Sequence, residues 1–455
     1  MNQKKTIENK NNPDKLLTSL TEDYFSAIKL TAQSKKKILS QIKDGIGTNK
    51  EYLKTLIVKE VKLTLKDAER EVVRAINTFA LAEKHADYEV INRIEKNGKI
   101  IQEKRIPRGP LLVITPFSSP LSSPAHKIAL GILAGTSILF KPSSQAQKTG
   151  KALYEIISAA TNGKYIYFSA NPSKKDLYSI VSDNRIGIIS FTGGYETGEK
   201  IVKTGGVKKY HMELAGGNSP VIFTQDYRHY NDQTVEKLLD GILAKNGQRC
   251  VSIKHIFIPQ EKSDFITKIQ EKFILLKQNI KKDFQNGKRT ILGPLINSEY
   301  ARSTEKKVNE ICQKYSQTIT PLIAIERDDD YLYPSLYMAK NIDKNLIKNI
   351  LDYDLPGPVV FIYFYKNNSE YKQILTAFQN DYIRSGLQLS FFTKTIAQVQ
   401  DEIKNIFWGG IIINDIPTFR DEFMSFGGFG KAGLGKEGFF ETINVYTDPK
   451  IVVYS

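Results

Sequence analysis

From about residue 110 onward, short apolar runs alternate with segments of helical length, and this alternation constrains the fold more than any other feature. Strand, helix and parallel strand in repetition build a doubly wound sheet with helices on both faces. Buried strands are predicted at LLVIT (111–115), SILFK (137–141), YIYF (165–168), IGIIS (186–190), YHMEL (210–214) and VIF (221–223). The fold class is therefore α/β, with a Rossmann-like, doubly wound parallel sheet of the dinucleotide-binding kind.

A second alternating series begins near residue 232 and continues to about 410, with helices predicted at 232–244, 261–279 and 298–316. A chain of 455 residues is also too long for one compact core. We therefore expect a second α/β lobe after the first. Before both, the first ~80 residues place apolar side chains such as Ile57, Val61 and Leu65 at helical spacing and are predicted to be helices.

One segment between the helical start and the first lobe differs in kind. The run EVINRIEKNGKIIQEKRIPRG contains two β-prone stretches on either side of Asn97-Gly98. Asn-Gly is a strong hairpin signal because both turn residues must adopt positive φ. The segment predicts a β-hairpin, which is either an edge decoration or an assembly arm.

The net charge of +16 raises the question of a nucleic-acid partner. Lysine is spread along the whole chain and mixed with glutamate, which favours solvated helix faces instead. We expect no nucleic-acid and no membrane partner, because no basic-aromatic cluster and no run of about 18 to 20 apolar residues occurs. Two cysteines cannot form a disulfide framework, and the start of the chain lacks an apolar signal region, so a cytoplasmic location is expected.

Two short motifs carry the candidate chemistry. In NGQRC, Cys250 can act as a nucleophile if Arg249 stabilises the thiolate; the alternative is a buried structural cysteine, as expected for Cys312. In HMELAGGNSP, Glu213 at a strand end can act as a general base if burial raises its pKa; the alternative is a surface glutamate at a turn.

Two further motifs suit a phosphate-bearing cofactor. FTGGYETG (191–198) places glycines between a strand and a helix, where backbone amides can meet a phosphate. FKPSS (140–144) places Lys141 at a strand end, where it either reaches ribose or phosphate oxygens or remains solvated. No metal site is expected, because His85, His126, His211, His229 and His255 are scattered singly.

The order of the motifs along the chain is more specific than any one motif. RGPLLVITPFSSPL, LAGTSILFKPSS, ISFTGGYETG, MELAGG, NGQRC, PGPVV and FMSFGGFGKAGLGKEG follow one another as in the aldehyde dehydrogenase superfamily. The chain resembles that family from about residue 15 to 450, and its C-terminal block is most similar to members that act on small hydroxyaldehydes or phosphorylated aldehydes.

The resemblance implies a reaction and a cofactor. Cys250 would attack the aldehyde carbonyl, hydride would pass to NAD or NADP, and Glu213 would activate the water that hydrolyses the thioester. It also implies homodimers or homotetramers assembled through the hairpin. The cofactor-binding residues would be Ile114, Thr115, Pro116, Phe117, Lys141, Ser143, Ser144, Phe191, Thr192, Gly193, Gly194, Leu214 and Asp354.

The same resemblance suggests domain boundaries. Residues 1–88 and 107–216 would form the dinucleotide-binding domain and 217–430 the catalytic domain. Residues 89–106 and 440–455 would form the oligomerisation arm.

The chain departs from the family pattern in five ways. Ser118 stands where an asparagine usually donates to the oxyanion, and loss of such a donor costs roughly 10²–10³ in rate. Ser144 replaces a glutamate that repels a 2′-phosphate, so we expect NADP to be tolerated and even preferred. Asp354 replaces the glutamate that holds the nicotinamide ribose, Pro356 replaces the aromatic residue beside that glutamate, and Gly194 replaces a serine that often contacts the pyrophosphate. ELAGGNSP is one residue longer than the usual block, which suggests a longer loop after Gly216.

Alternatives remain open at this point. A catalytically impaired relative with a binding or assembly role would explain the departures, and a CoA-acylating reductase is possible within the superfamily, although Glu213 favours hydrolysis. Arg249 and Arg420 are candidates to bind an anionic group on the aldehyde; equally, both could pair within the protein.

Overall fold

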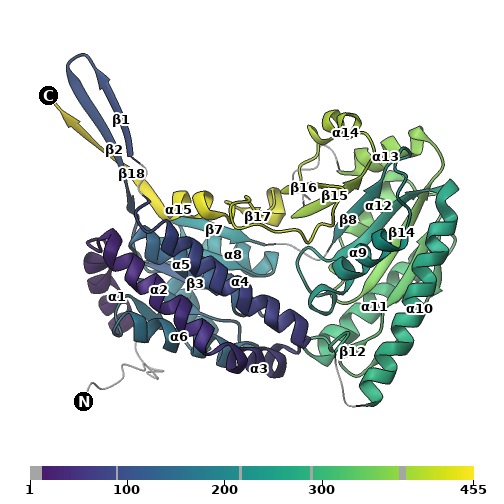
Figure 1. Cartoon of the computed structure of the whole chain (residues 1–455), viewed down its shortest axis with the longest axis horizontal. Coiled ribbons are helices and arrows are strands. Elements are labelled where there is room, and N and C mark those ends of the chain that lie inside the picture. Colours follow the sequence, from purple (N-terminus) through teal and green to yellow (C-terminus); the bar gives the residue numbers. More distant parts are fainter. Residues whose placement is uncertain (1–12, 89–90, 215–217, 287–289, 379–385) are drawn as a thin grey trace.

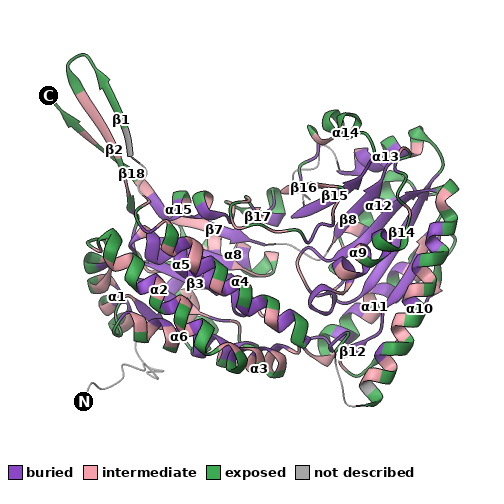
Figure 2. Ribbon diagram, in the orientation of Figure 1, coloured by how far each residue is buried: buried purple, intermediate pink, exposed green. Residues whose placement is uncertain are grey.

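The computed structural model describes residues 13–88, 91–214, 218–286, 290–378 and 386–455. Two α/β lobes lie side by side, and a narrow β-arm projects from the first (Figure 1). Each lobe is built on its own sheet, and the buried residues concentrate on these sheets and on the helix faces that cover them (Figure 2).

The first sheet has the strand order β17-β7-β6-β3-β4-β5. Its parallel strands are β3 (Leu111–Ile114), β4 (Ile138–Lys141), β5 (Ile166–Phe168), β6 (Ile188–Thr192) and β7 (Lys209–Glu213), and β17 (Gly433–Leu434) pairs antiparallel with β7. The chain leaves β3 toward β4 and leaves the adjacent β6 toward β7, on the other side. The sheet is therefore doubly wound, with its topological switch point between β3 and β6.

Helices cover both faces of this sheet because successive strand residues point to opposite sides. On β3, Leu111 and Val113 pack with α2 to α6, whereas Leu112 and Ile114 pack with α1, α7 and α8. The helices are α1 (Pro13–Ala27), α2 (Ala32–Thr48), α3 (Lys50–Val61), α4 (Leu65–Lys84), α5 (Ser122–Ala134), α6 (Gln147–Ala160), α7 (Lys174–Ser182) and α8 (Tyr195–Gly205).

The second sheet has the order β10-β13-β14-β9-β8-β15-β16. The strands are β8 (Ser219–Phe223), β9 (Ile253–Pro259), β10 (Ile319–Ile323), β13 (Ser335–Ala339), β14 (Val359–Tyr365), β15 (Gln388–Phe392) and β16 (Gly410–Ile413), all parallel except β10. Helices α9 (Asp232–Leu243) and α10 (Ser263–Gln285) contribute to the core on one face. Helices α11 (Ser298–Lys314), α12 (Lys344–Leu351), α13 (Asn368–Phe378) and α14 (Ile396–Ile403) contribute to the core on the other.

The arm is a sheet of β1 (Ile91–Lys96), β2 (Lys99–Pro107) and β18 (Thr447–Tyr454). Asn97 and Gly98 form the hairpin turn with φ of 54° and 72°, as predicted. Strand β18 pairs antiparallel with β2 from Pro107 to Ile100 and completes the arm. Just before it, α15 (Phe439–Tyr446) packs against α5 and β7 of the first lobe.

The fold expected from the sequence is confirmed. Each predicted strand and helix is present, with ends that differ by one to a few residues. β7 and β8 lie in different sheets, so the chain passes from the first lobe to the second between them; the extra residue after Gly216 lies outside the described residues. Among those described, no helix is both long and apolar enough to cross a bilayer.

Candidate active site

An interlobe cleft of about 600 Å³ collects most of the predicted site residues. The cleft is lined by the carboxyl ends of β3 and β6 on the first lobe and by the loop before β9 on the second. Predicted residues that line it are Pro116, Phe117, Ser118, Thr192, Gly193, Gly194, Glu213, Leu214, Arg249, Cys250 and Asp354. The nucleophile and the base predicted from the sequence therefore face one cavity.

Cys250 is presented by an unusual turn. Lys245, Asn246 and Gly247 have φ of 54°, 60° and 70°, so three successive residues adopt left-handed backbone. The Asn246 side chain holds this turn: Nδ2 donates to the carbonyls of Lys62 and Pro294, and Oδ1 accepts from the Gly293 amide. Such strain persists only where the surroundings fix it, and it occurs often at functional sites.

A buried lysine stabilises the turn that precedes Cys250. Lys254 on β9 has a fully buried side chain whose Nζ donates to the carbonyl of Gly247, at 2.8 Å, and to that of Gly357. A Cβ on Gly247 would lie 2.3 Å from the Gly357 carbonyl carbon, so the two loops can approach only with glycine here. Lys254 thus ties the Cys250 loop to the loop that follows Asp354.

The surroundings of Cys250 raise the pKa of its thiol. Burial raises its pKa, the Arg249 guanidinium lowers it, and the nearby Glu213 carboxylate raises it again. Apolar side chains of Val251, Leu387 and Phe426 pack around the sulfur, which explains the desolvation. The thiol therefore needs a base within the cleft to lose its proton.

Glu213, the last residue of β7, has the environment of such a base. Burial and the adjacent Glu437 carboxylate raise the pKa of Glu213, while Lys127 opposes the shift. The Lys127 ammonium lies 3.8 Å from Glu213 Oε1 and 3.7 Å from Glu437 Oε2. The ionised Glu437 thus makes Glu213 the member of the pair with the raised pKa, and a carboxylate with a raised pKa is a better proton acceptor than an ordinary glutamate.

Glu437 keeps its charge because cations surround it. Arg420 Nη2 donates to Glu437 Oε1 at 3.0 Å, Arg74 Nη2 lies 3.5 Å from the same oxygen, and Lys127 and His126 lower the pKa of Glu437 further. Arg420 also donates to the carbonyls of Asp421 and Met424. Its guanidinium is thus engaged within the protein and is absent from the lining of the cleft.

The other candidate cation, Arg249, is placed differently. It lines the cleft beside Cys250, and its guanidinium forms no hydrogen bond or ion pair with any described residue. The neighbouring Lys245, by contrast, donates to Glu71 at 2.7 Å and to Ser119. Arg249 therefore retains its donors for a group that enters the cleft.

The cofactor motifs meet at the switch point of the first sheet. Pro116 follows β3, and Gly193 and Gly194 follow β6, so both strand ends open into the cleft. Gly194 is the N-cap of α8 without a side-chain cap, and a Cβ there would meet nothing within 4 Å. Open space at an uncapped helix start fits a pyrophosphate.

The remaining predicted cofactor residues lie outside the lining of the cleft. Lys141 ends β4, its pKa is lowered by burial, and exposed Ser144 follows in the next turn. Ile114, Thr115 and Phe191 are buried in the strands behind the cleft, and Ser143 caps the turn by accepting from the Gln145 amide.

Sequence reasoning missed Glu437 and Lys127. Both have a signal in hindsight: Glu437 lies within the quoted GKEG segment, and Lys127 is a charged residue in α5, a helix buried almost all round. His211 was expected to stand alone, but its ring lies with Glu213 and Glu437 in a group whose ligand atoms are within 4.8 Å of one another. Lys127 already supplies positive charge there, so we assign no metal to this group.

Comparison with known proteins agrees with this geometry. The model of the family described as "Aldehyde dehydrogenase family" matches residues 14–452. The chain belongs to the aldehyde dehydrogenase family. The resemblance inferred from the motif order and the expected oxidoreductase class are thereby confirmed.

Individual relatives cover the chain almost completely. A lactaldehyde dehydrogenase of Methanococcus aeolicus is 31% identical over 97% of this chain and 92% of its own length. Aspartate-semialdehyde dehydrogenase 1 of Pseudomonas canavaninivorans is 29% identical over 91% of this chain and 86% of its own. The crystal structure of the glyceraldehyde-3-phosphate dehydrogenase GapN of Methanocaldococcus jannaschii with NADP superposes with a TM-score of 0.86 at 27% identity, covering 97% of this chain and 94% of that one.

Proposed function

We propose that the protein oxidises an aldehyde to a carboxylic acid with NAD or NADP, through a thioester on Cys250. The observation that carries the proposal is the shared cleft of Cys250 and Glu213, since a nucleophile needs its base within reach. Bound NAD(P) supplies the hydride acceptor for the oxidation step.

The protein side of the reaction begins with proton transfer. The Cys250 thiol gives its proton to Glu213 while Sγ forms a bond to the aldehyde carbon. The Cys250 backbone N–H and the Ser118 hydroxyl donate to the developing oxyanion. After oxidation, Glu213 takes a proton from water, the water oxygen adds to the thioester carbon, and the carbon–sulfur bond breaks to release the acid and the thiolate.

Glu213 must release its first proton before it can accept the second. The buried pair with Glu437 supports this role, because the ionised partner raises the pKa of Glu213 toward the working range of a base. Lys127, within 3.8 Å of both carboxylates, compensates their charge when both are ionised.

For the cofactor, we propose that Gly193 and Gly194 approach the pyrophosphate, Lys141 and Ser144 the adenosine ribose, and Asp354 the nicotinamide ribose. Residues Ile114 to Phe117, Ser143, Phe191, Thr192 and Leu214 complete the crevice. NADP is preferred, because the chain has no carboxylate at Ser144 to repel a 2′-phosphate, while Lys141 attracts it. Kinetics with both cofactors test this preference: Lys141→Gln should weaken NADP more than NAD, and a strong preference of the unmodified enzyme for NAD contradicts it.

The substrate is proposed to be a small aldehyde with an anionic group. Arg249 lies beside the nucleophile without an ion-pair partner among the described residues, which supports this proposal. Two of the similar proteins, an aspartate-semialdehyde dehydrogenase and a glyceraldehyde-3-phosphate dehydrogenase, are named for aldehydes that carry an anionic group. Arg420 is a weaker candidate, because Glu437 and two carbonyls occupy its donors.

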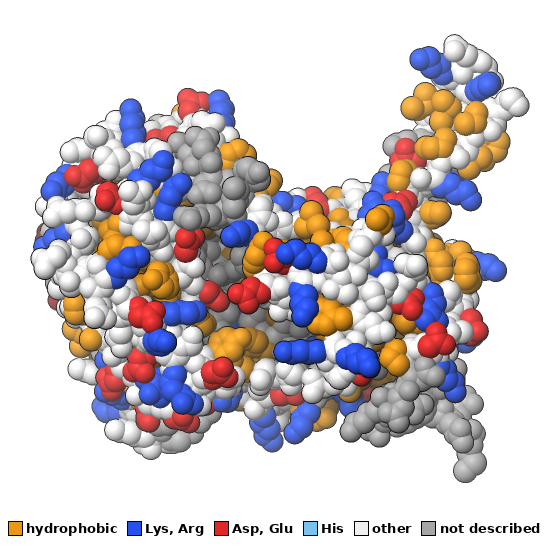
Figure 3. Space-filling view, turned by 180° about the vertical axis from the view of Figure 1, so that it is seen from behind, with side chains coloured by type: hydrophobic (Ala, Val, Ile, Leu, Met, Phe, Trp, Pro, Cys, Tyr) orange, Lys and Arg blue, Asp and Glu red, His pale blue; other side chains and the backbone are white. Residues whose placement is uncertain are grey.

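We also propose a cytoplasmic homodimer or homotetramer, assembled through the arm predicted at residues 89–106 and 440–455; within the second range, β18 forms the arm and α15 packs on the first lobe. The cofactor domain would comprise 1–88 and 107–216, and the catalytic domain 217–430; residues 1–12, 89–90, 215–217, 287–289 and 379–385 lie outside the described part. The arm exposes Ile94, Ile451, Val453 and Tyr454, and apolar side chains gather on it in the space-filling view (Figure 3). Sedimentation of Ile451→Lys/Val453→Lys should give monomers if the arm joins subunits.

A panel of aldehydes with both cofactors, followed by mass detection of the adduct, tests the reaction itself. We expect turnover to free acid and an acyl mass on the Cys250 peptide. Product formed only with coenzyme A would favour the acylating reductase instead. An intact fold with no turnover and no adduct on any aldehyde would favour the impaired relative.

A further inference from the structure

The second sheet has a switch point of its own, at a distance from the proposed reaction. After β8 the chain passes through α9 to β9 on one side, and after the adjacent β15 it passes through α14 to β16 on the other. Helices α9 and α14 pack on opposite faces of the sheet. In open α/β sheets, ligands bind in the crevice outside the carboxyl ends of such strands.

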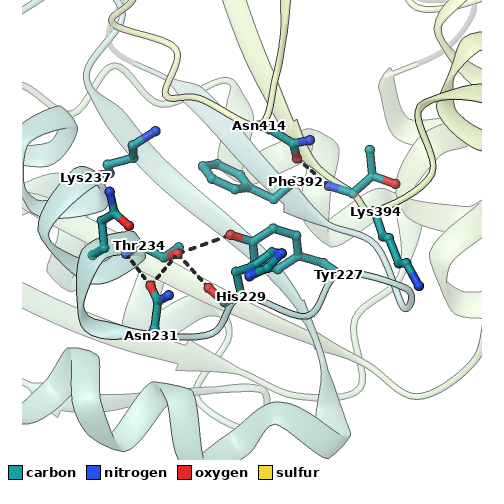
Figure 4. Close-up of a pocket in the computed structure, with 10 residues that line it drawn as sticks. Tyr227, His229, Asn231, Thr234, Lys237, Phe392, Lys394 and Asn414 are labelled. Carbon is teal, nitrogen blue, oxygen red and sulfur yellow. Dashed lines mark hydrogen bonds between the residues drawn. The ribbon is translucent and has the colours of Figure 1, made fainter.

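This crevice holds a pocket of about 370 Å³, which is the size of a small-ligand site. One wall is formed by residues between 227 and 237, which follow β8, and the other by Phe392 to Lys394 after β15, with Asn414 after β16 (Figure 4). We call this cavity the switch-point pocket. In the first lobe, the corresponding crevice between β3 and β6 opens into the interlobe cleft.

The walls of the pocket are fixed by their own hydrogen bonds. On the α9 side, Thr234 Oγ1 lies 3.1 Å from the Tyr227 hydroxyl and donates to the His229 carbonyl at 2.6 Å, while its amide donates to Asn231 (Figure 4). On the other side, Asn414, with φ of 59°, accepts from the Thr393 amide at 2.8 Å. The cavity is therefore preformed.

The charge of the pocket favours an anion. Lys237 and Lys394 come from opposite walls, and His229 and the Asn414 amide lie between them. The Asp226 carboxylate is turned into the β15–α14 turn, where it accepts from Thr224, Thr393 and the amides of Lys394 and Thr395.

Three other acidic groups belong to the chain segments that form the walls of the pocket. Asp415 lies 3.4 Å from Lys237, and exposed Asp232 and Glu236 belong to α9 outside the lining. Lys394 forms no ion pair with any described residue. From this arrangement we propose that the switch-point pocket binds a small phosphate or phosphate ester, at a site separate from the interlobe cleft.

The same two strands connect both sites. Asn218 precedes β8 and Leu387 precedes β15, and both line the interlobe cleft, whereas the far end of β15, Phe392, lines the switch-point pocket. A strand of five residues spans roughly 17 Å. The two sites are thus far enough apart to be occupied together.

Calorimetric titration of the NADP-saturated full chain with inorganic phosphate and glycerol 3-phosphate, neither of which carries an aldehyde, tests the proposal. We expect a binding event that Lys237→Gln/Lys394→Gln weakens about tenfold or more, because each lysine supplies a point charge to the phosphate. Arg249→Gln, which changes only the interlobe cleft, should leave this event intact. Lys203→Gln/Lys306→Gln removes two exposed lysines elsewhere and controls for net charge.

Three results would overturn the proposal: no event in the unmodified protein, equal weakening by the control pair, or loss only in Arg249→Gln. The titration measures no turnover, so failure of the aldehyde reaction leaves its outcome readable.

Discussion

Cys250 follows a strained turn at the interlobe cleft, whereas Cys312 lies in the last turn of α11, on a face of the second sheet. Burial raises the pKa of both thiols, that of Cys312 to about 11. The difference lies in what else surrounds them: Arg249 and Glu213 act on Cys250, and burial alone acts on Cys312. A reactive cysteine is therefore defined by its charged neighbours and its access to the cleft, more than by its own depth.

The largest test of this comparison removes each sulfur in turn. Cys250→Ala should lower kcat by about 10⁴-fold or more, because no other side chain can form the thioester. Cys312→Ala should keep the rate within about twofold, since its side chain only packs. Steady-state kinetics with the best aldehyde measure both, and equal losses would remove the distinction.

The second test concerns the base. Glu213→Gln should lower turnover by about 10²–10⁴-fold, the range expected for loss of a general base. Its raised pKa means that the unmodified enzyme gains activity as pH rises through a value well above that of an ordinary glutamate. Glu437→Gln removes the neighbouring negative charge, so the acidic limb of the pH–rate profile should move to lower pH. A limb unchanged by either variant would exclude Glu213 as the titrating group.

The third test asks whether Arg249 serves the substrate as well as the thiol. Arg249→Gln should lower kcat/KM for an anionic aldehyde about 10–100-fold more than for a neutral aldehyde of similar size, since it removes a charge-assisted contact. Lys203→Gln, a solvent-exposed change, provides the control. An equal loss of kcat/KM for both aldehydes would show that Arg249 acts on the thiol and not on the substrate.

The fourth test, with the smallest expected effect, measures how Glu213 changes the pKa of the Cys250 thiol. In Glu213→Gln, the thiolate of Cys250 no longer faces a carboxylate, so its pKa should fall. At alkaline pH, alkylation of Cys250 by iodoacetamide should then be about two- to fivefold faster. This ratio corresponds to a fall of less than one unit in the pKa of the thiol, because the rate follows the fraction of thiolate. Alkylation of Cys312, followed by peptide mass in the same sample, should not change.

Much of the fold followed from local patterns. Strand and helix positions were predictable because β-prone apolar runs and helical spacing act over a few residues, as at 111–115 and 298–316. The hairpin at Asn97-Gly98 was predictable because its turn type depends on two residues. Cys250 and Glu213 were recognised through motif order, and their motifs taken singly left a structural alternative open.

Other features required the folded chain. Lys127, Glu213 and Glu437 come from three distant segments, and only packing brings their charges within 4 Å. Arg249 and Arg420 looked alike in the sequence, but one lines the cleft without an ion-pair partner among the described residues and the other binds Glu437. Partner choice between arginines depends on distances that no local pattern contains.

By itself the sequence determined the order of secondary structure, the lobe types and the residues able to carry thioester chemistry, since these depend on neighbouring residues and side-chain type. Tertiary structure alone decided which carboxyl has the raised pKa, which arginine lines the cleft, and where the second switch point opens a pocket. Electrostatic energy and cavity shape depend on separations in space, and these arise only when distant segments pack together.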